Sequence, residues 1–141
     1  MGRLIILITL FLLPMAAVGE GVVEPNAAAR VEIISVIKSQ VAAFRQDDGV
    51  AAFSFASPTI RTKFGDASTF LAMVAAHYRP VYRPQQLEFL DLKSVEGQLV
   101  QRVMVVGPEG EFVLAMYSMV RIDGRWRING CFLVHPSGQR I

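Results

Sequence analysis

The dipeptide Asp123-Gly124 constrains the fold of this 141-residue chain more than any other feature. It stands between two long runs in which apolar residues recur, 111–122 and 125–135. A two-residue hairpin turn needs positive φ at both central residues, and Asp-Gly adopts this conformation at little cost. The sequence therefore predicts an antiparallel hairpin in which Ile122 faces Arg125.

Two further strands are expected before this hairpin, at 87–95 and 99–106. Turn residues separate them, Glu96-Gly97 between the two and the Gly-Pro-Glu-Gly segment 107–110 before the hairpin. Because short turns join antiparallel neighbours, the four runs predict one antiparallel sheet.

The chain before residue 80 has the periodicity of helices instead. Four apolar residues at spacings of four, four and three predict one buried helix face: Ile33, Ile37, Val41 and Phe44. Further helical segments are expected at 51–55, at 58–64 with Ser57 as the N-cap, and after Asp66 as the next cap. The predicted fold class is α+β, with N-terminal helices packed on a curved four-stranded antiparallel sheet.

The hairpin register also predicts that neither face of the sheet is fully polar. One face would carry Ser118, Arg127 and Asn129 beside Met116 and other apolar residues, and the opposite face would be mostly apolar. An antiparallel sheet normally shows one polar face to water, and helices cover only one side. The other side must be partly covered by curvature of the sheet, by a terminal segment or by a second subunit, and we expect a homodimer formed through the sheet face.

The N-terminus is typical of a secretory signal peptide. Arg3 precedes an unbroken apolar run, 4–13, and the small residues Ala17 and Gly19 suit cleavage. The run is shorter than the about 20 apolar residues that span a bilayer. An uncleaved anchor or a short buried helix is the alternative. We predict a signal peptide at 1–19, a linker at 20–29, one domain at 30–141, and an exported product, periplasmic or secreted, without a stable membrane anchor.

Charge and cysteine content limit the partners of the exported product. Without residues 1–19 the chain has 122 residues and a formal charge of +1 in place of +2, which gives no basic face for nucleic acid. Cys131 is the only cysteine, and it is expected to be a small buried hydrophobe; a reactive thiol or an intermolecular disulfide is the alternative. No metal site and no cofactor are expected, because His77, His135 and Cys131 lack ligand spacing.

Two segments resemble a known bacterial family. The first is QVAAFRQDDGVAAFSFASPTIRTKFGDASTFLAMVAAHYRPVYRP at 40–84, and the second is DGRWRINGC at 123–131. Together they resemble domain of unknown function 4864. The resemblance implies the nuclear transport factor 2-like superfamily, in which helices wrap against a strongly curved antiparallel sheet to form a cone with a pocket. That superfamily commonly has strands before its third helix, and here only 54–57 could supply one.

A cone of this kind implies a pocket, and five residues are candidates for its lining. The predicted register places Ser118, Arg127, Asn129 and Met116 on one face, where apolar walls with a few polar groups suit a small ligand. Arg127 could hold a carboxylate bidentately; alternatively it meets solvent or pairs with an acid. His77 lies on the apolar face of a predicted helix. It is expected to be either a buried imidazole that is hydrogen-bonded to the backbone or a base for proton transfer.

The segment 78–84 contains Tyr-Arg-Pro twice. Its prolines favour extended geometry in the residues before them, so we expect a rigid connector. Tyr78, Tyr82 and Arg83, with Trp126, are candidate interface residues, because aromatic and arginine side chains often anchor interfaces. The alternative is that the tyrosines complete the core.

The resemblance implies no established activity, since the superfamily mixes isomerases, dehydratases, hydrolases and binding modules. We expect an exported module that binds a small, partly apolar or anionic ligand, or a protein partner, without catalysis. The alternative is an enzyme that performs isomerase-like or dehydratase-like acid/base chemistry in the pocket. Its base would be His77 or a nearby acid, although capping of a helix junction explains Asp47 and Asp48.

Overall fold

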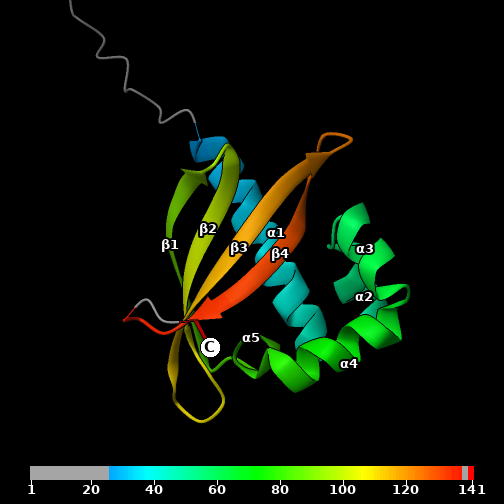
Figure 1. Ribbon diagram of the computed structural model, residues 1–141, viewed down its shortest axis with the longest axis vertical. Coiled ribbons are helices and arrows are strands. Elements are labelled where there is room, and N and C mark those ends of the chain that lie inside the picture. Colours follow the sequence, from blue (N-terminus) through cyan, green and yellow to red (C-terminus); the bar gives the residue numbers. More distant parts are fainter. Residues whose placement is uncertain (1–25, 138–139) are drawn as a thin grey trace, which may run out of the picture.

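The computed structural model describes residues 26–137 and 140–141, which form a helical layer and a sheet (Figure 1). Within these residues the helices come first: α1 (Ala27–Arg45), α2 (Gly49–Ser54), α3 (Pro58–Phe64), α4 (Ala67–His77) and α5 (Arg79–Tyr82). The strands follow: β1 (Gln86–Val95), β2 (Gln98–Val106), β3 (Phe112–Ile122) and β4 (Arg125–Val134). The predicted α+β class is confirmed.

The predicted signal peptide, 1–19, lies outside the described residues, and so do residues 20–25 of the predicted linker. α1 begins at Ala27, so the last three residues of that linker are helical. In the described part of the chain, no helix is both long and apolar enough to cross a membrane.

Short polar side chains begin three of the helices. Asp48 accepts a hydrogen bond from the Ala51 N–H at 3.0 Å, and Asp66 accepts one from the Thr69 N–H at 2.7 Å. Ser57 caps α3 in the same way, and Pro58 occupies its first turn. The predicted caps at these three positions are confirmed. The prediction of an extended connector at 78–84 is wrong at its centre, because Pro80 fits the first turn of the short helix α5.

The four strands form one antiparallel sheet in the order β1-β2-β3-β4. Their bounds agree with the sequence prediction to within one residue. Asp123 and Gly124 have φ values of 50° and 75°, as the predicted hairpin turn requires.

The hairpin register agrees with the prediction only near the turn. Ile122 pairs with Arg125, but the register shifts between Ser118 and Met119, so that Ser118 pairs with Gly130. Asn129 is the additional residue of a β-bulge on β4. The predicted Ser118–Asn129 pair is therefore wrong.

Past the bulge, every side chain of β4 changes face relative to the prediction. Tyr117, not Met116, pairs with Cys131. Cys131 consequently packs against the core beneath the helices, whereas Phe132 lies on the outer face and is 39% exposed. Met116, Ser118 and Arg127 share one face, as predicted, but it is the outer face of the sheet rather than the face on which the helices pack, and Cys131 and Leu133 do not lie on it.

The bulge lies where the helical layer joins the sheet. The Ile128 N–H donates to the Phe55 carbonyl at 2.9 Å, and the Ser57 N–H donates to the Ile128 carbonyl at 2.8 Å. Ser57 Oγ also donates to Asn129 Oδ1 at 2.8 Å. Ala56 thereby forms an isolated parallel bridge with Ile128, which is the strand-like contact that the segment 54–57 makes with the sheet.

α1 runs along one face of the sheet, and α2, α3 and α4 stand beside β4 (Figure 1). The predicted helix face is confirmed, since Ile33 and Ile37 are fully buried among core residues of β2 and β3. The opposite sheet face is partly exposed, with Phe112 at 61%. One layer of helices therefore covers one side of the sheet.

Asp47 has a different role from the predicted cap. Its carboxylate accepts hydrogen bonds from the Tyr82 hydroxyl and, at 2.7 Å, from the Arg83 guanidinium. Arg83 also donates to the Phe44 carbonyl, and its guanidinium lies 4.0 Å from the centre of the Tyr82 ring. These contacts fasten α5 to the end of α1, and the hydrogen bonds from Tyr82 and Arg83 lower the pKa of Asp47.

We expect Asp47→Asn to lower the melting temperature at neutral pH. A folded-state pKa below the ordinary 3.8 means that this carboxylate stabilises the fold above pH 3.8. The contribution is lost as the pH falls through the lowered value. The difference between wild type and variant should therefore shrink below about pH 4 in thermal unfolding by circular dichroism. Asp48→Asn is the matched control, because asparagine still caps α2. An equal loss in both variants would contradict the role assigned to Asp47.

Candidate functional site

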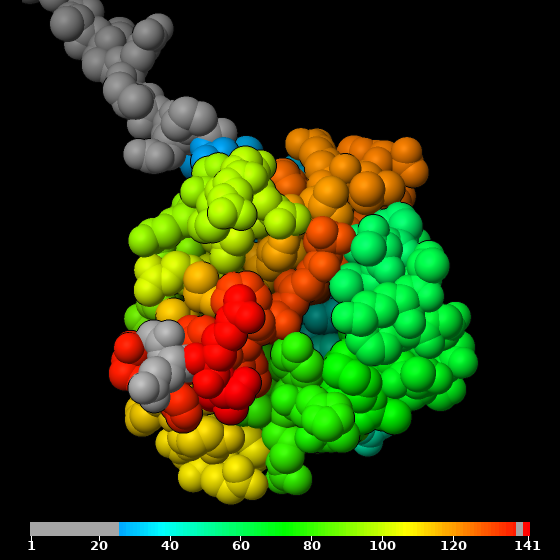
Figure 2. Space-filling model, in the orientation of Figure 1, coloured from blue at the N-terminus to red at the C-terminus, as the bar shows by residue number. Residues whose placement is uncertain are grey.

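A pocket opens between the helices and the sheet. Its volume is about 480 Å³, within the range of about 300–1,000 Å³ that is usual for small-molecule sites. Figure 2 shows the surface hollowed between β4 and the helices α3 and α4, with α1 visible at the base of the hollow. Sixteen residues line the pocket: Gln40, Phe44, Ala56, Ile60, Lys63, Phe64, Phe70, Met73, Val74, His77, Tyr78, Val81, Tyr117, Ile128, Gly130 and Cys131.

Aromatic rings form the helical wall of the pocket. The Phe70 ring of α4 lies 6.1 Å from that of Phe44 in α1 and 5.7 Å from that of Phe64 in α3. Contacts of this kind hold three helices around one apolar surface. The wall is therefore suited to a flat or aliphatic ligand body.

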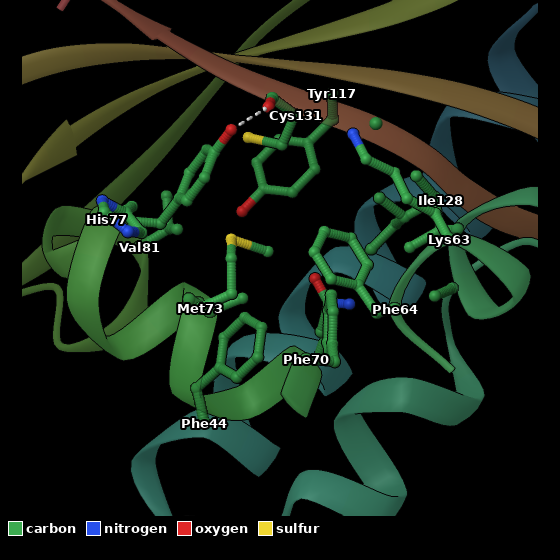
Figure 3. Close-up of a pocket in the computed structure, with 16 residues that line it drawn as sticks. Phe44, Lys63, Phe64, Phe70, Met73, His77, Val81, Tyr117, Ile128 and Cys131 are labelled. Atoms are coloured by element: carbon green, nitrogen blue, oxygen red, sulfur yellow. Dashed lines mark hydrogen bonds between the residues drawn. The ribbon is translucent and has the colours of Figure 1, made fainter. Parts of the chain in front are cut away.

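The hydroxyl of Tyr117 is the main polar feature of the pocket interior. Tyr117 lies on β3 and is 1% exposed, and its hydroxyl makes no hydrogen bond of ordinary geometry in the described structure, with the thiol of Cys131 as a weak partner. In Figure 3 the hydroxyl points from the sheet into the pocket, toward Met73 of α4. Burial raises its pKa well above 10, so the phenol stays neutral and can donate a hydrogen bond.

Tyr78 and Cys131 border the same side of the pocket. The Tyr78 hydroxyl donates to the Cys131 carbonyl at 3.1 Å (Figure 3). Burial of the thiol raises the pKa of Cys131 to about 12. Because the thiolate is the nucleophilic form, Cys131 acts at neutral pH as an apolar wall rather than as a reactive group.

Two basic side chains stand at the mouth. Lys63 of α3 and His77 at the end of α4 line the pocket and are exposed. His77 is exposed at the last residue of α4, so the expectation of a buried imidazole there is wrong. Among the described lining residues there is no Asp or Glu.

Of the five candidate ligand residues, only His77 lines the pocket. Arg127 pairs with Val120 next to the hairpin turn, and Ser118 lies opposite Gly130. Asn129 is occupied as the acceptor of the Ser57 hydroxyl, and Met116 pairs with Arg102 and Phe132 on the outer face. Met116, Ser118 and Arg127 share one sheet face, as the register predicted, but the helices and the pocket lie against the opposite face, which carries Tyr117.

The four candidate interface residues lie at several places. Tyr78 lines the pocket, while Tyr82 and Arg83 are bound to Asp47. Trp126 is half-buried, packs against the core, and has a buried Nε1–H without a partner in the described structure. These side chains thus take part in contacts within the chain.

Sequence reasoning missed Tyr117 and Lys63 as lining residues. The predicted register places Tyr117 on the mostly apolar face of its strand. A single hydroxyl among aliphatic residues could have indicated a site, because a buried hydroxyl needs a hydrogen-bond partner. Lys63 gave no signal, because one lysine in a short amphipathic helix is ordinary.

The fold and the pocket define an α+β domain whose helices cover one face of a curved antiparallel sheet and border a cavity of ligand size. Residues 26–141 match the family described as domain of unknown function 4864, and the chain belongs to that family. The family expected from the sequence is thereby confirmed. None of the curated proteins compared with the chain matches it. One solved chain, named Rd1NTF2_05 with five substitutions, is 20% identical over 78% of this chain and 99% of its own, with a TM-score of 0.48.

Proposed function

We propose that the domain binds a small, largely apolar molecule in this pocket and donates a hydrogen bond to it from Tyr117. The observation that carries the proposal is the buried hydroxyl without a hydrogen bond of ordinary geometry, aimed into the cavity. A buried polar group without a partner costs about 1–3 kcal/mol. An acceptor atom on a ligand would remove that cost, whereas a purely structural tyrosine would be expected to find a partner in the protein.

The lining supports binding over proton-transfer chemistry. Such chemistry needs a base inside the pocket, within reach of the reacting atom. Among the described lining residues the candidates are His77 and Lys63, which stand exposed at the mouth, and Tyr78, Tyr117 and Cys131, which stay protonated because burial raises their pKa values. None is an ionised base inside the pocket, so a binding module is the function that the geometry favours.

The setting of this binding module is also a proposal. The signal-like segment 1–19 supports export to the periplasm or the medium. The partly exposed outer face, with Phe112 at 61% and Phe132 at 39%, supports a homodimer through the sheet.

The proposed pocket is tested with N-phenyl-1-naphthylamine, an uncharged probe that fluoresces in apolar sites. We expect saturable binding to the wild type with one site per chain. The double variant Ile60→Trp/Met73→Trp should lose it, because both side chains line the cavity and the larger rings fill it. Thr59→Trp/Ala72→Trp is the matched control, since these exposed neighbours on α3 and α4 face away from the cavity. Equal binding by both double variants would place the probe elsewhere and refute the pocket as its site.

A further inference from the structure

The distribution of charge around the pocket is one-sided. Its sixteen lining residues include Lys63 and His77 but no acidic residue within the described part of the chain. α3, which forms one lip of the mouth, carries Arg61 and Lys63 in its last turn and has no acid in its first. A ligand that enters between α3 and α4 therefore meets donors and positive charge.

The ammonium of Lys63 is available to a ligand. The ion pairs among the described residues involve Arg79, Arg83, Lys93 and Arg102, and none involves Lys63. Asp66, the acid that follows it most closely in the chain, is engaged as the cap of α4.

Lys63 is also placed to face a bound molecule. Its Nζ lies 5.5 Å from the centre of the Phe64 ring, which belongs to the apolar wall. In Figure 3 its side chain extends from α3 toward the strands that carry Tyr117 and Cys131. The positive charge thus stands at the rim, next to apolar surface.

The interior itself is unsuited to a charge. Its walls are aromatic and aliphatic, and its polar group without an ordinary hydrogen bond is the neutral hydroxyl of Tyr117. An ionised group buried there would lose its hydration without an opposite charge to replace it. A charged ligand would therefore leave its charged end at the mouth and insert its apolar body.

We propose that the pocket is selective for anionic amphipaths, in which a carboxylate or sulfonate pairs with Lys63 at the mouth and an apolar body lies against Phe44, Phe64 and Phe70. The proposal rests on the proposed function of the pocket and adds the chemical class of its ligand. The residue that binds the anion is then Lys63 on α3, and not Arg127 as the sequence suggested. The charge-assisted contact is exposed to solvent, so it weakens as salt is added.

The test compares two probes that share one apolar body. 8-Anilinonaphthalene-1-sulfonate carries a sulfonate, and N-phenyl-1-naphthylamine lacks it. Both are titrated into the wild type, Lys63→Met and Arg61→Met at low salt and at 0.5 M sodium chloride. Lys63→Met keeps the apolar stem, and Arg61→Met removes an exposed charge of the same helix that does not line the pocket. We expect Lys63→Met to weaken sulfonate binding about two- to fivefold at low salt and to leave the uncharged probe unchanged.

The outcomes separate the two proposals. If the uncharged probe fails to bind the wild type, the proposed function itself fails. If it binds, but Lys63→Met changes both probes by the same factor or neither, the pocket stands and the anionic class is overturned. An equal, selective loss of sulfonate binding in Arg61→Met would assign the effect to the overall charge of α3 and would likewise overturn the role of Lys63.

Discussion

Replacing Ile37 with alanine is expected to lower the free energy of unfolding by about 2–5 kcal/mol. Ile37 is fully buried where α1 packs on β2 and β3, in the cluster that includes Val103 and Ala115. Truncation removes apolar contacts and leaves a cavity that a helix held against a sheet closes only in part. Domains of this size are stable by about 5–15 kcal/mol, so the loss takes a large share of the total.

The measurement is urea unfolding at 25 °C followed by circular dichroism, with the midpoint and slope fitted separately. Val31→Ala is the matched control, because Val31 lies on the same helix and is 70% exposed. Its effect should stay within about 0.5 kcal/mol. Ile37→Val, which removes less volume, should cost about 0.5–1.5 kcal/mol. If all three variants have the same free energy of unfolding, the buried face of α1 does not contribute to the stability of the core.

Local chemistry explains why so much of the fold could be predicted from the sequence. The caps at Asp48, Ser57 and Asp66 act on backbone groups three residues away, and the Asp123-Gly124 turn joins its own flanking strands. Signals of this kind lie within a few residues of the structure they determine. The bounds of the strands and the buried face of α1 were predictable for the same reason.

The candidate site was predicted poorly because it depends on contacts between segments that are far apart in the sequence. Asn129 bulges from β4 where its side chain accepts a hydrogen bond from Ser57, which is 72 residues earlier in the chain. Nothing in the alternating pattern of 125–135 marks that residue as additional. The single bulge exchanges the faces of Cys131 and Phe132. Tyr117 rather than Ser118 lines the pocket because the helices cover the opposite face of β3 from the one proposed as the pocket wall. The prediction of a buried His77 was wrong for a second reason. Helical periodicity shows on which face of the helix a residue lies, but it does not show whether another element covers that face.

Removing the hydroxyl of Tyr117 and removing that of Tyr78 should change the free energy of unfolding in opposite directions. Both residues line the pocket, and both lose only one oxygen atom when changed to phenylalanine. The Tyr78 hydroxyl is bonded to the Cys131 carbonyl, whereas that of Tyr117 makes no hydrogen bond of ordinary geometry in the described structure. Tyr78→Phe should lower the free energy of unfolding by about 0.5–1.5 kcal/mol, and Tyr117→Phe should raise it by about 1–3 kcal/mol, because it removes an unpaired buried group.

The ligand side of this prediction uses benzophenone and diphenylmethane, which share two phenyl rings and differ by one carbonyl oxygen. In competition with N-phenyl-1-naphthylamine, the wild type should bind the ketone about two- to tenfold more tightly, the worth of one neutral hydrogen bond. Tyr117→Phe should abolish that preference, and Tyr78→Phe should retain it. If the Tyr117→Phe variant is stabilised but still prefers the ketone, another group donates the hydrogen bond to the carbonyl oxygen. A destabilised one would show that the hydroxyl already has a partner, and the argument for a ligand acceptor at Tyr117 would fall with it.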